Sequence, residues 1–256
     1  MLKADRINKI HELIKERQII SLDELCDIFS VSKNTIRRDI AELDAEGVIE
    51  KVYGGIVLKE SVSNSPEPFA AREIRNVAEK KIIAQIAASL IQDGEVIYVD
   101  SGTTTMHLLP HLANRKQLTI VTANIYVIDY ASRYQNLNVI ATGGYVYPPS
   151  NALVGPGVIS CIKAYNFSKI FLASTGISIE HGATNASPLE CEIKQRLVQK
   201  SCPKFLLVDN SKLDVASLMT YCELNAIDNI IMNETPPEKY LTYFEKNNVR
   251  LLTESK

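Results

Sequence analysis

The chain has 256 residues, of which 46% are hydrophobic and 23% are charged, and its formal net charge is −2. This balance is typical of folded globular proteins and excludes the disordered and fibrous classes. No stretch approaches the roughly 20 consecutive apolar residues of a membrane-spanning helix, so no membrane partner is expected. The length allows a small domain followed by a medium-sized one.

The N-terminus and the cysteines predict a protein of the reducing cell interior. The first residues lack the apolar segment of a secretory signal, and we therefore expect a cytoplasmic location. The five cysteines are scattered without a C-x-x-C pair, and the four histidines do not stand at zinc-finger spacing. We expect reduced thiols, with neither a disulfide framework nor a metal site.

The first thirty residues predict two helices. Up to about Glu16, apolar residues recur at helical spacing, at Ile7, Ile10, Leu13 and Ile14. Ser21 and Glu24 then form a capping box, whose side chains satisfy free N–H groups at a helix start. The apolar face of the second helix consists of Leu22, Leu25, Ile28 and Phe29.

The next segment predicts a helix suited to contact DNA. Ser32 is its expected N-cap, and it runs from Lys33 to about Glu46, where Gly47 supplies the left-handed residue that ends it. One side faces the other helices through Ile36, Ile40 and Leu43. The other side of its first two turns carries Lys33, Asn34, Arg37 and Arg38. Residues 1–60 hold ten Lys and Arg against twelve Asp and Glu, but the basic side chains are sorted to where a recognition helix meets DNA.

A β-hairpin is predicted directly after this helix. Two β-rich runs, residues 48–53 and 56–58, flank a two-residue turn at Gly54-Gly55, a pattern typical of hairpins. A hairpin in this position is the wing of a winged helix-turn-helix. The alternative is a structural three-helix subdomain with a solvated charged face. Two caps, a sorted basic face and a hairpin in this order favour DNA binding.

These residues resemble the DeoR family of sugar-metabolism regulators. The run from Phe29 to Ile40 contains the family's V-S-x-x-T-I-R-R-D pattern without a gap, and Tyr53-Gly54-Gly55 follows. Lys51 departs from the family, which usually has arginine there; lysine keeps the charge and loses the bidentate fork. The partner that the resemblance implies is double-stranded operator DNA. The expected DNA contacts are Ser32, Lys33, Asn34, Thr35, Arg37, Arg38, Lys51, Tyr53 and Gly54.

The rest of the sequence predicts a linker and an α/β domain. We expect the DNA-binding domain over residues 1–58, a linker over 59–75 that begins with a stretch rich in Pro, Ser and Glu, and the larger domain over 76–256. Seven β-branched runs alternate with helices, at 96–99, 119–122, 139–142, 170–173, 205–208, 230–232 and 250–252. This alternation predicts a three-layer α/β domain with a mostly parallel sheet.

Polar residues at the strand ends of this domain suit an anionic ligand. Ligands of such sheets bind beyond the carboxyl ends of the strands. The first strand ends in Asp100-Ser101-Gly102-Thr103-Thr104-Thr105 and leads into a helix, where N–H groups, the helix dipole and hydroxyls favour an anion. Each such feature alone is often ordinary capping, but together they favour a phosphorylated ligand. Neither G-x-x-x-x-G-K-[ST] nor G-x-G-x-x-G after a strand occurs, so we expect no nucleotide cofactor.

The DeoR resemblance extends through this domain, which in the family is a sensor similar to ribose-5-phosphate isomerase. It implies a phosphorylated sugar as effector, repression that the effector relieves, and a homo-oligomer, dimer or tetramer; the residues alone leave the sign of the response open. Ser101 to Thr105 are expected on the phosphate, and Glu190 and Lys212 near the sugar. The full set of expected effector contacts is Asp100, Ser101, Gly102, Thr103, Thr104, Thr105, Asn124, Gly143, Gly144, Thr175, Gly176, Glu190 and Lys212.

A sugar-phosphate isomerase is the main alternative. Its chemistry needs a carboxylate base and acids that polarise a carbonyl group. Isomerases of similar fold carry an acidic loop after the strand that here ends at Ala173. In this chain the loop 174–178 has no aspartate, and its nearest carboxylate is Glu180, although Glu190 or Glu192 remains available as a base. We therefore expect no catalytic residues. A third alternative, a DNA-bridging protein without a ligand, leaves the hydroxyl-rich loop unexplained.

Overall fold

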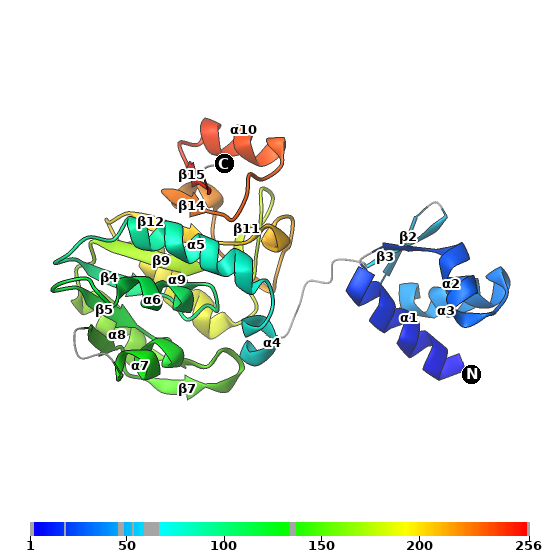
Figure 1. The fold of residues 1–256 in the computed structure, drawn as a ribbon, viewed down its shortest axis with the longest axis horizontal. Helices are drawn as coiled ribbons and strands as arrows, with labels where there is room; N and C mark the ends of the chain where they lie inside the picture. The colour runs from blue at the N-terminus through cyan, green and yellow to red at the C-terminus, as the bar shows by residue number, and fades with distance from the viewer. Residues whose placement is uncertain are drawn as a thin grey trace. The chain divides into compact units, whose positions relative to one another are not determined.

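A computed structural model of the protein describes residues 3–17, 19–45, 49–52, 54–58, 67–133 and 137–254. The chain divides into two compact units, Met1–Val62 and Ser63–Lys256 (Figure 1). Gly47 and Tyr53, together with residues 59–66 of the expected linker, lie outside the described residues. No helix in the described part of the chain is long and apolar enough to cross a membrane.

The first unit is a three-helix fold with a small antiparallel sheet. Its elements are α1 (Lys3–Arg17), β1 (Ile19–Ser21), α2 (Leu22–Phe29), α3 (Lys33–Ala45), β2 (Ile49–Val52) and β3 (Gly55–Leu58). The sheet has the order β1-β3-β2, so β1 joins the predicted hairpin as a third strand. The Ser21 side chain accepts a hydrogen bond from the Glu24 amide at 3.1 Å, which confirms the predicted cap of α2.

Two local expectations in this unit were wrong. Ile28 is 43% exposed, so it does not belong to the buried face of α2. Gly55 lies in β3 opposite Val52 and not in the turn. A Cβ atom on Gly55 would come within 2.6 Å of the Ile20 carbonyl oxygen, so the close approach of β1 explains this glycine.

The second unit is built on a seven-stranded sheet in which every pair is parallel. Its strands lie within one residue of the predicted runs: β4 (Val96–Val99), β5 (Thr119–Thr122), β6 (Asn138–Ala141), β9 (Lys169–Ala173), β12 (Lys204–Leu207), β14 (Asn229–Ile231) and β15 (Arg250–Leu252). The order is β15-β14-β12-β9-β4-β5-β6. The loops after β4, β9 and β12 therefore meet at one edge.

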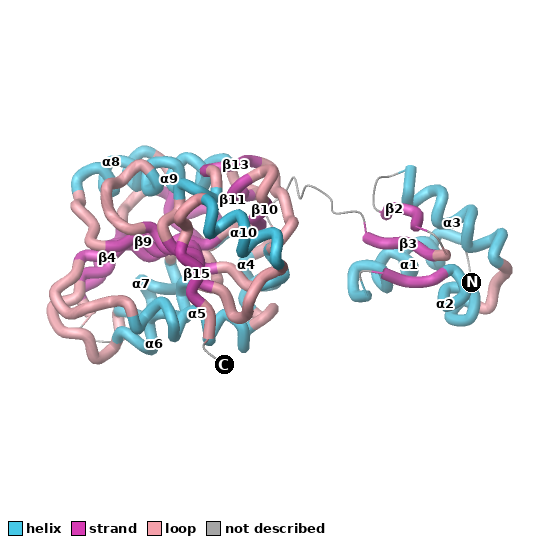
Figure 2. Tube along the Cα trace, turned by 90° about the horizontal axis from the view of Figure 1, so that it is seen from above, coloured by secondary structure: helices cyan, strands magenta, loops and turns pink. Residues whose placement is uncertain are grey.

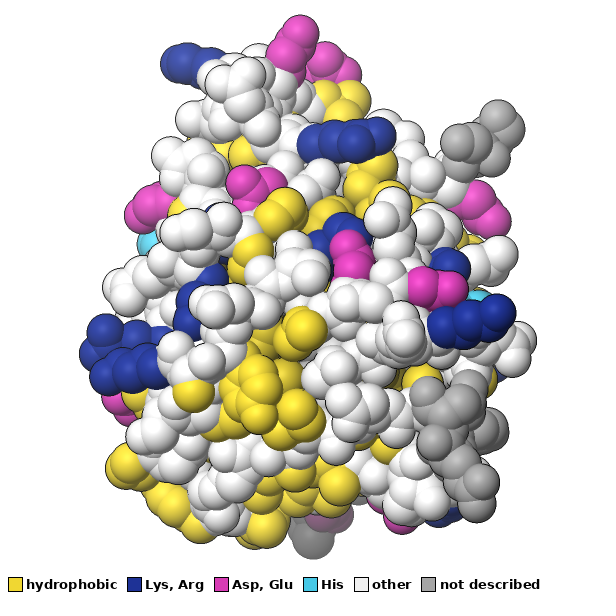
Figure 3. Space-filling view, turned by 90° about the vertical axis from the view of Figure 1, so that its left-hand side faces the viewer, with side chains coloured by type: hydrophobic (Ala, Val, Ile, Leu, Met, Phe, Trp, Pro, Cys, Tyr) yellow, Lys and Arg dark blue, Asp and Glu magenta, His cyan; other side chains and the backbone are white. Residues whose placement is uncertain are grey.

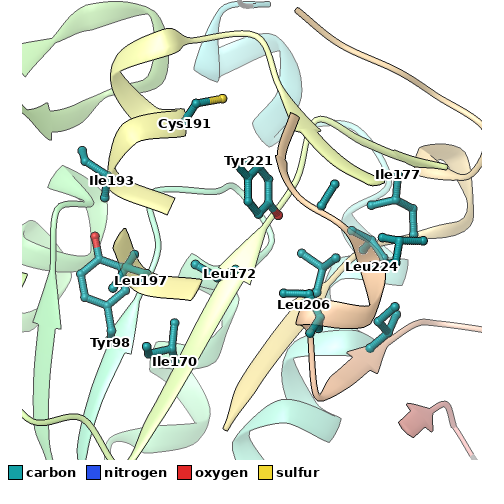
Figure 4. Packing of buried hydrophobic residues seen from close by; sticks show 14 of the residues in the cluster. Tyr98, Ile170, Leu172, Ile177, Cys191, Ile193, Leu197, Leu206, Tyr221 and Leu224 are labelled. Atoms are coloured by element: carbon teal, nitrogen blue, oxygen red, sulfur yellow. The ribbon is translucent and has the colours of Figure 1, made fainter. Parts of the chain in front are cut away.

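Helices cover both faces of this sheet and make the predicted three layers (Figure 2). One face is covered by α5 (Val77–Ser89), α6 (Leu109–Leu112) and α7 (Ile125–Ala131), and the other by α8 (Pro156–Ala164), α9 (Pro188–Val198) and α10 (Glu238–Lys246). Side chains alternate between the faces, so Ile97 packs under α5 while Tyr98 points to α9. Ile193 and Leu197 of α9 lie over Ile170 and Leu172 of the sheet (Figure 4).

Several short elements that the sequence did not predict surround this core. They are the helix α4 (Phe69–Glu73), the hairpin β7 (Tyr145–Tyr147) with β8 (Ala152–Val154), and a sheet of β10 (Gly176–Ser178), β11 (Gly182–Asn185) and β13 (Met219–Cys222). The helix α4 lies within the range that the sequence assigned to the linker. The small sheet matters for function because it carries the loop after β9 back across the edge where the strands end.

Candidate functional site

The first unit presents the amino-terminal half of α3 to solvent. Lys33, Asn34, Arg37 and Arg38 are all exposed, whereas Ile36 and Ile40 are buried against the other helices. Among the described residues, neither Arg37 nor Arg38 makes an ion pair. Both guanidinium groups are thus available to phosphates or base edges.

The aspartate that follows these arginines has a structural role. Asp39 is 1% exposed and accepts two hydrogen bonds from Arg6 of α1, from Nε at 2.6 Å and from Nη2 at 3.2 Å. The bidentate pair fixes α3 on α1 and keeps a negative charge away from the exposed face. The basic and acidic residues of the R-R-D run therefore point to opposite sides of the helix.

A groove separates α3 from the wing and is lined by Arg37, Lys51, Leu22, Ile40, Val52, Gly55 and Ile56. Arg37 and Lys51 bring positive charge from two elements to this one groove. The expected contacts are not all free of acidic partners: Lys33 pairs with Asp23 at 2.5 Å, and Lys51 pairs with Asp44 at 2.7 Å. Both pairs are exposed and hence weak, so a DNA phosphate can replace the carboxylate.

The remaining expected DNA contacts shape the approach to these cations. Ser32 is exposed, and its Oγ lies 3.1 Å from Thr35 Oγ1 at the start of α3. Gly54 is exposed at the tip of the wing with a φ of +83°, which glycine adopts without strain. Tyr53 lies outside the described residues.

The second unit contains a polar pocket at the carboxyl edge of its sheet. It has about 550 Å³ of space between its walls, with the open mouth included. The lining residues are Arg72, Arg75, Asn76, Lys80, Gly102, Thr103, Thr104, Ala173, Ser174, Thr175, Asn185, Glu190, Lys194, Asp209 and Lys212. The structure thus brings six of the thirteen expected effector contacts to one pocket: Gly102, Thr103, Thr104, Thr175, Glu190 and Lys212.

The loop after β4 uses its hydroxyls in two ways. Thr103 and Thr104 line the pocket, whereas Thr105 donates to the carbonyl oxygens of Asp100 at 2.7 Å and Gly102 at 2.9 Å. Ser101 donates to Glu190 Oε1 at 3.0 Å. Two of the four hydroxyl-bearing residues that were expected on the phosphate therefore line the pocket. The loop continues into the short 3-10 helix η1 (Thr105–Leu108) and four-residue α6, so the helix dipole contributes less than expected.

The glycine of this loop is explained by packing against the neighbouring strand. A Cβ atom on Gly102 would collide with the Cβ of Ala173, the last residue of β9. We expected this glycine among the effector contacts. Its first requirement is instead the contact between two strand ends, which also lets Thr103 reach the pocket.

Asp100 lies beneath the pocket in a buried ion pair. Its Oδ2 pairs with Lys194 of α9 and accepts a hydrogen bond from the Ala173 amide at 2.9 Å. Lys194 also donates to the Ala173 carbonyl oxygen at 2.6 Å. Because these partners neutralise one another, Asp100 holds two strand ends and a helix together and does not present free charge to a ligand.

Four basic side chains lie together among the lining residues of the pocket. We call Arg72, Arg75, Lys80 and Lys212 the basic wall. Burial lowers the pKa of Lys80 to about 8, and the positive charges of the other three members act in the same direction. Burial also lowers the pKa of Lys212. Asp209 is a nearby counter-charge for both lysines, and Glu67 is a second one for Lys212 and pairs with Arg75. Four basic side chains stand against these two carboxylates, so the wall favours an additional anion.

Asn124, Gly143, Gly144 and Gly176 do not line the pocket. The Asn124 side chain caps α7 by accepting from the Tyr126 amide at 2.9 Å, and it supports the loop after β4 from behind. Gly143 and Gly144, with φ of +71° and +106°, make the turn between β6 and β7. Gly176 belongs to β10, and Val215 packs against it. These four residues position neighbouring segments.

The acidic loop of an isomerase is absent from the pocket. The segment after Ala173 forms β10, and it brings Ser174 and Thr175 to the pocket without a carboxylate. The side chain of Glu180, the nearest carboxylate in sequence, is 85% exposed. Glu190 and Asp209 are the two carboxylates among the lining residues, and Glu190 is hydrogen-bonded to Ser101, an arrangement suited to bind a hydroxyl group. Among the described residues, no cluster of three or more His, Cys, Asp or Glu could hold a metal ion.

Nine of the fifteen lining residues were not among the expected effector contacts. Arg72 and Arg75 fell in the expected linker, and neither Lys80 nor Lys194 was in the expected set. For Lys80 the sequence does contain a signal, which is the helical period of α5. Lys80 occupies a position on the buried face of this helix, with Ile83 and Ala87. A lysine at an apolar helix position indicates a buried charge that needs a partner.

Comparisons with known proteins agree with both units. The profile of the DeoR-like helix-turn-helix domain matches residues 6–62, and that of the DeoR C terminal sensor domain matches residues 75–234. The chain is 37% identical to the HTH-type transcriptional regulator IolR of Bacillus subtilis (strain 168) over 248 residues, 97% of this chain and 98% of the relative. It is 30% identical to the HTH-type transcriptional repressor GlcR of the same organism over 252 residues, 98% and 96% of the two chains. A solved ribose 5-phosphate isomerase from Plasmodium falciparum aligns with a TM-score of 0.38 and 16% identity, over 53% of this chain and 52% of that chain.

Proposed function

This chain belongs to the DeoR family of DNA-binding transcriptional regulators. We propose that a phosphorylated sugar, bound in the pocket of the second unit, controls the affinity of the protein for operator DNA. The chain is a regulator of sugar-related genes and not an enzyme, as its relatives are named regulators and repressors. Its DNA partner gives it a cytoplasmic site of action.

The observation that carries this proposal is the pairing of the basic wall with the loop after β4. Thr103 and Thr104 offer hydroxyl donors, and Arg72, Arg75, Lys80 and Lys212 offer positive charge. A phosphate dianion matches both, because it accepts several hydrogen bonds and carries about two negative charges near neutral pH. Glu190 also lines the pocket, and its carboxylate oxygens can accept hydrogen bonds from the hydroxyl groups of a sugar.

In the proposed complex with DNA, α3 lies in the major groove and the wing contacts the phosphate backbone. Paired half-sites require a homo-oligomer, and the second unit has exposed apolar side chains that suit such contacts. Tyr145 and Val146 of the β7–β8 hairpin are 53% and 54% exposed. One face of the molecule shows acidic and basic side chains interspersed around a continuous hydrophobic area (Figure 3), a feature typical of protein interfaces.

A thermal-shift screen of the full chain tests the effector class. Aldose and ketose phosphates are compared with the same sugars without phosphate. A true effector at 100 times its Kd adds about 2.7 kcal/mol to the free energy of unfolding, and the unphosphorylated sugar adds far less. Lys116 is an exposed lysine at the opposite edge of the sheet. The variant Lys116→Met should therefore be stabilised by the effector as strongly as wild type. Equal stabilisation by phosphorylated and unphosphorylated sugars would remove the phosphate from the proposal.

A further inference from the structure

The two arginines of the basic wall also hold Glu67, which lies two residues before α4. Arg75 donates to both carboxylate oxygens of Glu67, from Nη2 to Oε1 at 2.7 Å and from Nη1 to Oε2 at 3.3 Å. Arg72 donates from Nε to the Glu67 carbonyl oxygen at 3.0 Å. In sequence, Glu67 stands on the side of the pocket that leads back to the DNA-binding unit.

The helix α4 that carries Arg72 is anchored independently of Glu67. The ring of Phe69 stacks on Tyr126 of α7 with centroids 4.5 Å apart. The Arg72 carbonyl oxygen accepts a hydrogen bond from Lys80, and Tyr126 donates to Glu73 at 3.3 Å. Loss of the Glu67 contact therefore leaves α4 in place and changes only the segment that precedes Phe69.

Glu67 and a bound phosphate have overlapping requirements for Arg75. A planar guanidinium group binds either a carboxylate or a phosphate through the same two-pronged fork. The Arg75 and Glu67 side chains are 56% and 36% exposed, so their ion pair is weak and readily exchanged. A phosphate dianion carries more charge than a carboxylate and, within the pocket, gains Lys80 and Lys212 as well.

We infer that Arg75 is a latch that exchanges its partner. Its guanidinium group leaves the Glu67 carboxylate for the phosphate of the effector, and this loosens the attachment of residues 67–68, which precede α4. This inference rests on the proposed function, since it assumes an anionic effector in this pocket. It assigns the coupling of the two events to one side chain. Phosphate binding and the pairing of Glu67 with Arg75 then compete, and each weakens the other by the same factor.

The affinity of the full chain for inorganic phosphate, measured by calorimetry at constant ionic strength, tests the latch. Glu67→Gln removes the competitor and should tighten phosphate binding about two- to fivefold, the range expected for loss of an exposed ion pair. Arg75→Gln should weaken it about tenfold, as expected when a charge-assisted contact is lost. The matched control is Glu73→Gln, which removes the same charge from α4 without a contact to Arg75 and should bind phosphate like wild type.

A double-mutant cycle separates the latch from simple repulsion between Glu67 and phosphate. If Glu67 acts through Arg75, then Glu67→Gln has no effect in the Arg75→Gln background. Tightening of the same size in both backgrounds, or none in the wild-type background, overturns the latch while leaving the anion pocket intact. A wild-type chain that binds neither inorganic phosphate nor any sugar phosphate overturns the proposed function, and the latch with it. Melting temperatures of all four variants confirm that each one is folded.

Discussion

A single buried lysine gives the sensor pocket a distinctive dependence on pH. Lys80 is 3% exposed, and its ammonium group donates to the Arg72 carbonyl oxygen. Its charged surroundings are Asp209, which favours the protonated form, and Lys212, Arg72 and Arg75, which oppose it. Burial is the largest influence, and the pKa of Lys80 falls from 10.5 to about 8. An anion in the pocket binds the protonated form and raises this pKa again.

We expect the affinity for a sugar phosphate to fall as the pH rises above about 8, by up to about tenfold per pH unit if one proton is taken up with each ligand. It should also fall below about pH 6, where phosphate loses its second charge. The free energy of unfolding without ligand moves oppositely. Because Lys80 binds more protons in the unfolded chain, its contribution to stability rises with pH between about 8 and 10.5.

Calorimetric titrations across this pH range check the expectation. Lys80→Met keeps the length of the side chain without its charge, so its affinity should be lower throughout and should lack the decline above pH 8. A decline of unchanged size in this variant would assign the alkaline limb to Lys212, whose pKa burial also lowers.

At the scale of elements, the exposed residues of α3 are expected to contact DNA, and its buried residues stabilise the fold. Arg37→Ala and Arg38→Ala should each weaken operator binding and leave the melting temperature unchanged, because both side chains are exposed. If either arginine reads a guanine, its loss costs about 1–3 kcal/mol at one base position. Gel-shift titrations at matched salt provide the measurement. Wild-type affinity in both variants would show that this face of α3 does not contact DNA.

The neighbouring Asp39 is the control for this prediction. Asp39→Ala leaves Arg6 without its buried partner, which typically costs about 3–5 kcal/mol of folding free energy. Its operator binding should fail only to the extent that the unit unfolds. Adjacent residues of one sequence motif thus give opposite signatures in the two assays.

Sequence reasoning succeeded where an element carries its own pattern. The apolar period of α3, the serine cap of α2 and the seven β-branched runs each predicted an element that the structure contains. It failed where an element depends on distant contacts. The strands β10 and β11 hold only three and four residues with Gly, Thr and Ser, and α4 has five residues held by stacking of Phe69 on Tyr126.

The same distinction applies to the pocket. Thr103, Thr104 and Lys212 follow strands, so the rule for strand ends placed them together. Arg72 and Arg75 come from a segment with no strand before it, and no local pattern relates them to Lys212. Asp100 was expected on the ligand, and its pairing with Lys194 across 94 residues became visible only in three dimensions.

At the scale of the whole molecule, regulation requires that the effector bind two arrangements of the chain with different affinity. Only that difference in binding free energy shifts the balance between them, and typical couplings of 1–3 kcal/mol change operator affinity by about 5- to 150-fold. The second unit holds the pocket, the first holds the recognition helix, and the chain around Glu67 joins them. A variant that removes this difference in effector affinity should leave each unit folded and abolish the effect of the effector on operator binding.

The double variant Thr103→Val with Lys212→Ala is expected to do this. It removes one hydroxyl donor from the loop after β4 and one charge from the basic wall, and both residues belong to the second unit. Operator affinity without effector should equal that of wild type, and the effector should no longer change it. If the loop merely caps η1, the variant loses melting temperature but keeps its response in whatever remains folded. The matched control is Thr119→Val with Lys116→Ala, the same two changes at the amino end of β5, which should respond like wild type. A pocket variant that still leaves its operator at the wild-type effector concentration would show that Thr103 and Lys212 do not bind the phosphate.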